Sequence, residues 1–475
     1  MHKRLTRAAW LLAICALVLA TSATAQEKAA PKTLQMTSSS IAAKTALVTA
    51  LEEVTNIGGG RRFDAKLQAV IAADPSFALG RAYYAMWTST LTPAQRSTEL
   101  KRALTDAVAN STPAELIFIN GLSESQAGRN GTARDLYDIV LKLTPDDPNV
   151  TFVRLLIAAN ADEARRIGEA AIARFPTYAP TYNLLAYRYN TDGRKEDALR
   201  TVAKYVELAP THPNSHDSYA EILQLQGRLD EADKHYVSAL KNDPQFDVAL
   251  VGRAEIAILR GNYAAARPYI TQALAMATTP ARKITLQRQM AATYLYEGNL
   301  KAARSLLTTM VKDAETNGLN ALPDKRALGF IAALEGDNAE AIKQYTAGKP
   351  VTPGVNAPFT DAVFHAFMKH PAEVNRAVTE MEASAAKVPE NLDAQDAMRA
   401  ARVIGAIINK DLNSAQSAQR HVLGPGYKAL TGALLMQAAN RAGNKGMAQS
   451  TKADVEAYKD LSMNAGFARL IAKQK

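Results

Sequence analysis

The chain has 475 residues, a net charge of +10 and one cysteine, Cys15. A single cysteine excludes a disulfide framework and a cysteine-rich metal site. The basic residues are not interleaved with stacking aromatic residues, which argues against a nucleic-acid-binding surface.

The first 25 residues have the pattern of a secretory signal peptide. Lys3, Arg4 and Arg7 precede an apolar run over residues 8–20, and Ala23-Thr24-Ala25 fits the cleavage rule for small residues. The apolar run is short for a membrane anchor, which is the alternative interpretation. The pattern therefore predicts cleavage after Ala25 and a periplasmic or secreted protein. No transmembrane segment is expected after cleavage.

The segment after the signal is polar, and helices are expected to begin beyond it. Residues 26–40 include Pro31 and the serines 38–40, which favours a flexible leader. A helix is predicted over residues 41–56. The glycine triplet 58–60 follows it and lacks the Gly-Lys-Ser/Thr ending of a phosphate-binding loop, so it is interpreted as a turn.

One helical hairpin is repeated three times between residues 179 and 278. Its first helix has an apolar stripe, and a glycine suited to a left-handed C-cap ends that helix. Its second helix carries a small alanine, and a proline closes two of the units. The recurring positions, spaced by 34 residues, are Gly193, Gly227 and Gly261; Ala198, Ala232 and Ala266; and Pro210 and Pro244.

These features together resemble the tetratricopeptide repeat (TPR). The early tryptophan of that motif is replaced here by Tyr182, His216 and Leu250. The resemblance implies an all-α fold, a right-handed solenoid of stacked helical hairpins, over residues 41–346. Because one hairpin cannot bury its apolar face alone, neighbouring hairpins must stack.

The repeat becomes irregular towards the C-terminus. Gly298 and Gly336 mark two further hairpins, and residues 347–358, with three prolines and two glycines, are predicted to be a linker or hinge. Residues 359–475 are predicted to form degenerate helical hairpins. No segment alternates apolar and polar residues, so no sheet is expected.

The excess positive charge is concentrated near the C-terminus. Residues 399–475 contain twelve Lys/Arg and four Asp/Glu, whereas the rest of the chain after the signal is close to neutral. One hypothesis is contact with an anionic surface through residues 399–475. The alternative is an ordinary solvated helical face.

The sequence offers no catalytic, cofactor or metal motif. The pairs His212/His216 and His365/His370 lack further ligands at suitable spacing, so no metal site is predicted. His216 occupies a packing position that Tyr182 holds one repeat earlier. It is interpreted as a core or rim histidine.

The resemblance implies that the first helices of the hairpins line a concave groove. The positions carried over predict a groove that binds a peptide or protein, because Asn and Gln can meet backbone donors and acceptors and Tyr adds apolar area. The alternative is that these residues are only the polar side of each helix. They are Asn183, Tyr187, Asn190, Asp217, Glu221, Gln224, Glu255, Arg288 and Tyr296.

The function predicted from the sequence is a non-catalytic, exported scaffold for protein interactions in the bacterial cell envelope. A helical carbohydrate-active enzyme, with two carboxylates about 5–10 Å apart in a funnel, is the second hypothesis. A structural assembly factor is the third.

Overall fold

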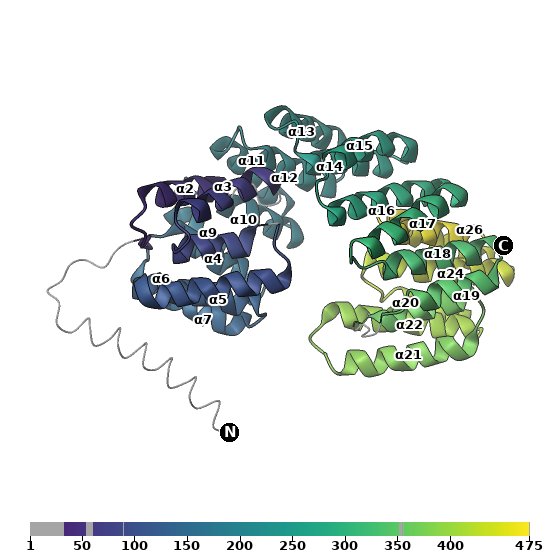
Figure 1. The fold of residues 1–475 in the computed structure, drawn as a ribbon. Helices are drawn as coiled ribbons and strands as arrows, with labels where there is room; N and C mark the ends of the chain where they lie inside the picture. The colour runs from purple at the N-terminus through teal and green to yellow at the C-terminus, as the bar shows by residue number, and fades with distance from the viewer. Residues whose placement is uncertain (1–32, 54–59, 89, 351–353, 355, 475) are drawn as a thin grey trace, which may run out of the picture. The chain divides into compact units, whose positions relative to one another are not determined.

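The computed structural model describes residues 33–53, 60–88, 90–350, 354 and 356–474. The predicted signal peptide, residues 1–25, lies outside the described residues. Within them the chain is all-helical, which confirms the predicted fold class (Figure 1). No described helix is both long enough and apolar enough to span a bilayer.

The chain divides into two compact units, one ending at Val248 and the other starting at Ala249. In the first unit, consecutive helices pack as antiparallel pairs, from α2 with α3 to α12 with α13. Its helices are α2 (Ile41–Glu52), α3 (Gly60–Ala73), α4 (Ala78–Trp87), α5 (Pro93–Asn110), α6 (Pro113–Gln126), α7 (Asn130–Leu143), α8 (Pro148–Leu156), α9 (Ala161–Arg174), α10 (Ala179–Thr191), α11 (Lys195–Leu208), α12 (Pro213–Leu225) and α13 (Leu229–Asn242).

In the hairpins α6–α7, α10–α11 and α12–α13, the turn is set by a glycine in the left-handed region. Gly193 and Gly227 have φ of 75° and 80°. The residue after each glycine donates its backbone N–H to a carbonyl of the preceding helix, Arg194 to Tyr189 at 2.8 Å and Arg228 to Leu223 at 2.9 Å. This six-to-one bond satisfies a carbonyl that the helix end leaves open, so the predicted C-caps are confirmed.

Small residues let the paired helices approach closely. Ala186, Ala198, Ala220 and Ala232 are all fully buried. At the position equivalent to Ala186 in an earlier hairpin, Gly121 faces Tyr137, and a Cβ atom there would lie 2.5 Å from the ring. The bulk of the tyrosine therefore explains the glycine.

The end of the predicted leader is held in place, which corrects the expectation of flexibility for residues 33–40. Leu34 N donates to Asp147 Oδ2 at 2.9 Å, Thr37 hydrogen-bonds to the fully buried Glu115, and Ser38 Oγ donates to Asp74 Oδ2 at 2.5 Å. The three acceptors lie where one hairpin joins the next, so the segment runs along these junctions. Burial raises the pKa of Glu115.

The second unit continues with helical pairs and ends in an additional helix. Sequence analysis did not predict this last helix, α26. The helices are α14 (Asp247–Leu259), α15 (Tyr263–Met276), α16 (Pro280–Glu297), α17 (Leu300–Thr316), α18 (Leu322–Glu335), α19 (Asn338–Ala347), α20 (Ala357–Phe367), α21 (Pro371–Ala386), α22 (Leu392–Ile408), α23 (Leu412–Gln419), α24 (Pro425–Arg441), α25 (Lys445–Ala457) and α26 (Met463–Lys473).

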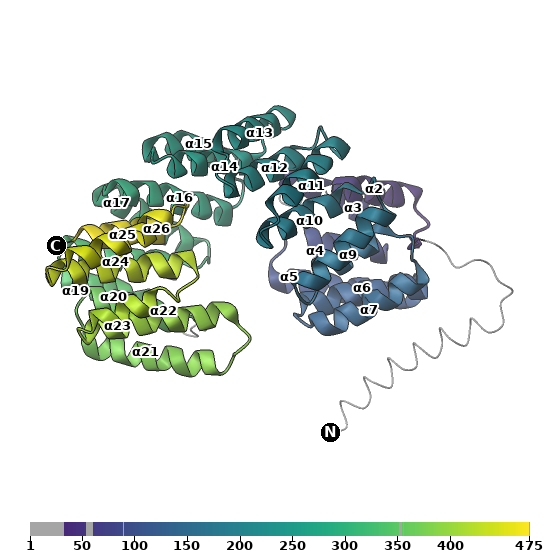
Figure 2. The same ribbon diagram turned by 180° about the vertical axis from the view of Figure 1, so that it is seen from behind.

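Helix α26 packs against α16, α18 and α24. Figure 2 shows α26 beside α16 and α24. Gly466 permits the close approach to α16, because a Cβ atom there would lie 2.6 Å from Leu295 Cβ. Phe467, on the same helix, is buried in the core of the unit. The C-terminal helix is therefore an integral part of the second unit.

The predicted hinge at residues 347–358 does not separate two packed parts. Tyr345 before it stacks on Phe364 after it, with ring centroids 3.8 Å apart and an interplanar angle of 3°. Tyr345 Oη and Lys349 Nζ both donate to Asp361, each at 2.8 Å. Residues 351–353 and 355 lie outside the described residues. The helices on both sides share one hydrophobic core, which corrects the expected boundary.

Candidate protein-binding face

Four of the predicted groove residues come together on two neighbouring first helices. Asn183 and Tyr187 lie one turn apart on α10, and Asp217 and Glu221 hold the equivalent positions 34 residues later on α12. Tyr187 Oη donates to Glu221 Oε2 at 2.6 Å. This bond joins residues one full repeat apart, so the first helices lie side by side as the 34-residue period predicts. We call these four residues the α10–α12 face.

Burial differs within the α10–α12 face. Asn183 and Asp217 are each only 6% exposed, Tyr187 is half-buried and Glu221 is exposed. Burial, together with the neighbouring Glu221 carboxylate, raises the pKa of Tyr187 well above its ordinary value. The tyrosine hydroxyl therefore stays protonated and remains a donor to Glu221 near neutral pH.

Asn183 carries an unused hydrogen-bond acceptor. Its side-chain Oδ1 is buried and has no partner among the described residues. A buried amide oxygen without a donor costs on the order of 1–3 kcal/mol, so the packing around Asn183 holds this side chain in place at an energetic cost. The α10–α12 face also contains two carboxylates, those of Asp217 and Glu221. It therefore favours a ligand with hydrogen-bond donors and positive charge over a ligand with a carboxylate group.

The other two predicted residues of this unit have partners within the chain. Asn190 Oδ1 accepts from Gln226 Nε2 at 3.2 Å, and Gln224 Oε1 accepts from Tyr236 Oη at 3.1 Å. Both side chains are half-buried. They border the α10–α12 face and fix its edges.

The three predicted residues of the second unit are placed differently. Glu255 is half-buried on α14. Arg288 forms a two-pronged ion pair with the fully buried Asp324, at 2.8 and 2.7 Å. Its guanidinium therefore has a structural role, because it neutralises a buried carboxylate.

Tyr296 is covered by the C-terminal part of the chain. The side chain is 3% exposed, and its hydroxyl donates to Asp460 O and accepts from Asp460 N, both at 3.0 Å. Its ring stacks on Tyr263 and lies under the Arg469 guanidinium. The structure therefore places Tyr296 in the core, which corrects its assignment to an open groove.

One residue of this site was missed by sequence analysis. Ser218 is buried beside Asp217 and hydrogen-bonds to Tyr187. The same position is Leu184 one repeat earlier and Gly252 one repeat later, so the repeat gives no signal for a polar contact.

Four of the seven histidines form two pairs. His216 and His235 bring their Nδ1 atoms within 3.1 Å, and Tyr219 packs on His235 with ring centroids 4.2 Å apart. His216 is thus a half-buried packing residue, as predicted. His365 and His370 form a second pair at 3.3 Å. Neither belongs to a cluster of three or more metal-ligating side chains within the described part of the chain.

Replacing His235 with phenylalanine is expected to weaken the acid sensitivity of folding. Burial and the neighbouring His216 lower the pKa of His235 from 6.5 to about 4, although Glu231 opposes the shift. The unfolded chain therefore binds a proton that the folded chain refuses, and stability is lost as the pH falls from 6.5 to 4. The loss attributable to this group is up to about 3 kcal/mol. Urea unfolding at several pH values measures it, and an equal pH slope in both proteins would contradict the assignment.

Basic residues near the C-terminus are partly neutralised. At least four of the twelve in residues 399–475 pair with carboxylates, namely Arg399 with Asp396, Arg402 with Glu382, Lys428 with Asp454 and Lys452 with Glu456. Contact of this region with an anionic surface stays a prediction.

Comparison with known proteins gives structural similarity only. No family model matches the chain, and no curated protein matches it either. Among solved structures, a thermophilic TPR protein of Thermus thermophilus is 21% identical, with 38% of this chain and 99% of that chain covered and a TM-score of 0.34. A TPR protein from Parabacteroides merdae is 13% identical over 52% of this chain and 98% of that chain, with a TM-score of 0.38.

A longer alignment is found with the APC/C hetero-tetramer Cut9-Hcn1. It covers 76% of each chain at 15% identity and a TM-score of 0.38. These scores are too low to carry an argument about function. The consecutive helix pairs and the 34-residue spacing, by contrast, are observed in this chain directly, and they resemble the pattern of the tetratricopeptide repeat.

Proposed function

We propose that the protein is a non-catalytic scaffold that binds another protein in the bacterial cell envelope, through the α10–α12 face. The observation that carries the proposal is the Tyr187–Glu221 bond, which joins α10 to α12 and places a half-buried tyrosine beside an exposed carboxylate. The envelope location is supported by the signal-like pattern of residues 1–25.

The chemistry of the α10–α12 face defines the partner segment. Asn183 Oδ1 and the carboxylates of Asp217 and Glu221 are acceptors, and the Tyr187 hydroxyl is engaged with Glu221. An extended loop that presents backbone N–H groups and a Lys or Arg side chain would donate to the exposed Glu221 carboxylate and match the negative charge of Asp217 and Glu221. A free C-terminal carboxylate would be repelled.

The test begins with identification of the partner in cells. A photo-cross-linking residue at Tyr187 is expected to capture a discrete protein, whereas the same residue at the exposed Arg200 on α11 is not. The captured protein is then purified, and its affinity is measured by calorimetry.

Replacing Asn183, Tyr187 and Glu221 together by alanine is expected to weaken this affinity by about tenfold or more, since hydrogen-bonded central residues carry much of the binding energy. Helix content should be unchanged. The matched control replaces Arg200, Lys204 and Glu207 on α11, whose ion pairs lie within that helix. Equal affinity of both triple variants would reject the α10–α12 face as the binding site.

A further inference from the structure

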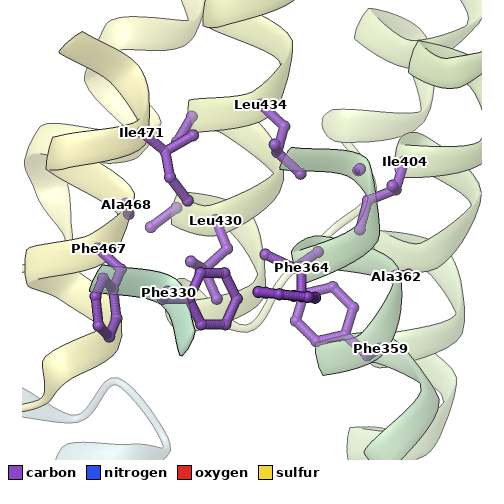
Figure 3. Packing of buried hydrophobic residues seen from close by; sticks show 14 of the residues in the cluster. Phe330, Phe359, Ala362, Phe364, Ile404, Leu430, Leu434, Phe467, Ala468 and Ile471 are labelled. Atoms are coloured by element: carbon purple, nitrogen blue, oxygen red, sulfur yellow. The ribbon is translucent and has the colours of Figure 1, made fainter. Parts of the chain in front are cut away.

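The second unit contains a cavity of about 400 Å³ lined by residues of α18, α20, α22, α24 and α26. Its walls are largely aromatic and aliphatic, and Figure 3 shows Phe330, Phe359, Leu430 and Phe467 gathered from four of these helices. Pockets of this size accommodate small organic molecules. The apolar walls are Phe330, Phe359, Val363, Tyr427, Leu430 and Phe467.

One end of the cavity is polar. Asn356 Nδ2 donates to the Asp393 carboxylate and, at 3.0 Å, to Tyr427 Oη. Asn356 Oδ1 is buried and has no partner among the described residues. Burial and the Asp393 carboxylate raise the pKa of Tyr427, which keeps its hydroxyl protonated. The polar end therefore presents the exposed Asp393 carboxylate, to which Asn356 and Tyr427 are hydrogen-bonded.

At the polar end of the cavity, Asp393 is the carboxylate available to a ligand, because the neighbouring acidic residues are engaged by other groups of the protein. Asp396 is already engaged by Leu423 N at 2.8 Å, Gly424 N at 2.5 Å and Arg399 at 3.0 Å. Asp361 binds Lys349, and Lys428 pairs with Asp454. Within the described residues, no ion pair joins Asp393 to a lysine or arginine.

We propose that this cavity binds a small organic amine with an aromatic or branched aliphatic body. The body lies among Phe330, Phe359 and Phe467, where removal of apolar surface from water supplies most of the binding energy. The protonated amine lies at the polar end, where it faces the exposed Asp393 carboxylate. This site is independent of the α10–α12 face, so either proposal can fail without the other.

A carboxylate of the same size is the appropriate competitor. The cavity is also lined by Gly424, Pro425 and Gly426 at the start of α24, and the positive end of a helix favours anions. Preferred binding of the amine would indicate recognition by Asp393, whereas preferred binding of the acid would indicate recognition by the start of α24.

The experiment measures binding of phenethylamine and of 3-phenylpropionate to the purified protein by calorimetry and saturation-transfer NMR. Phenethylamine is expected to bind with a dissociation constant of about 0.1–1 mM, and about tenfold more tightly than the acid. Asp393→Asn should weaken the binding of phenethylamine by about threefold to fivefold, as expected for the loss of an exposed ion pair. It should also remove most of the preference for the amine over the acid.

A filled cavity provides the second variant. Thr360 lines the cavity, and Thr360→Phe should abolish binding of the amine, whereas Thr379→Phe on the exposed surface of α21 should not. The control for the charge change is Glu373→Gln, in the first turn of α21. Thermal melting checks that each variant folds. No amine binding at about 10 mM, equal binding of amine and acid, or full binding by a folded Thr360→Phe variant would overturn the proposal.

Discussion

Replacing Arg288 by alanine is expected to lower the free energy of unfolding of the second unit by about 3–5 kcal/mol. The substitution removes the two-pronged partner of Asp324, a carboxylate with no exposed surface. An unpaired buried charge is costly, and the protein must either expose it or protonate it. Chemical denaturation followed by circular dichroism measures the loss.

A matched arginine separates this effect from the loss of any surface ion pair. Arg304 on α17 pairs with Glu335, and both side chains are about one-third exposed. Arg304→Ala should cost no more than about 1 kcal/mol. If Arg288→Ala were as mild as Arg304→Ala and instead weakened binding of a partner protein, the assignment of Arg288 to a binding groove would regain support.

Replacing Phe364 by alanine is expected to cost about 3–5 kcal/mol as well, because it opens a cavity in the aromatic core. Phe364 is 1% exposed, stacks on Tyr345 and meets Phe330 edge-on with centroids 5.2 Å apart. These contacts join α18, α19 and α20 across residues 347–358. The measurement is again denaturant unfolding.

The control for the phenylalanine is its neighbour on the same helix. Phe367 is only half-buried, so Phe367→Ala should cost clearly less. If Phe364→Ala left α16–α19 as stable as before and loosened only the helices after residue 358, the two sides would be independent parts and the predicted hinge would be correct after all. Hydrogen exchange resolved by segment distinguishes these outcomes.

The first unit could be predicted in detail because its signals are local. Gly193 and Gly227 mark turns that depend on the preceding few residues, and the fixed period then places Tyr187 next to Glu221 without further information. In a regular repeat, residues one period apart in the sequence lie next to each other in the structure.

The second unit could not be predicted in the same way. After Gly261 the turn glycines are more than 34 residues apart. A position counted forward by 34 residues therefore no longer has the same structural surroundings as its equivalent in the first unit. The groove positions assigned to Arg288 and Tyr296 depended on that count. Tyr296 is buried by residues more than 160 positions later in the chain, at Asp460 and Arg469. Nothing near Tyr296 in the sequence indicates that contact.

The aromatic cavity is an extreme case of the same difficulty. Phe330 and Phe467 meet there with ring centroids 5.2 Å apart, although each belongs to a helix whose own pattern indicates only a buried apolar face. Sequence patterns identify a core position but not which distant core position it faces. Asn356, which supplies a polar group there, lies within the proline- and glycine-rich segment 347–358, and its sequence context gave no signal of this role.

The attachment of residues 33–40 has a practical consequence for anyone who shortens the chain. A truncated protein that starts at Ile41, where the helical repeats begin, would strip Glu115 of the Thr37 contacts and Asp147 of the Leu34 amide. Glu115 has no exposed surface in the folded chain, so its carboxyl group would have to find water or a proton instead. A domain boundary chosen from the repeat alone would thus remove the contacts that residues 33–40 make with the helical hairpins. A truncated protein that begins several residues earlier keeps these contacts.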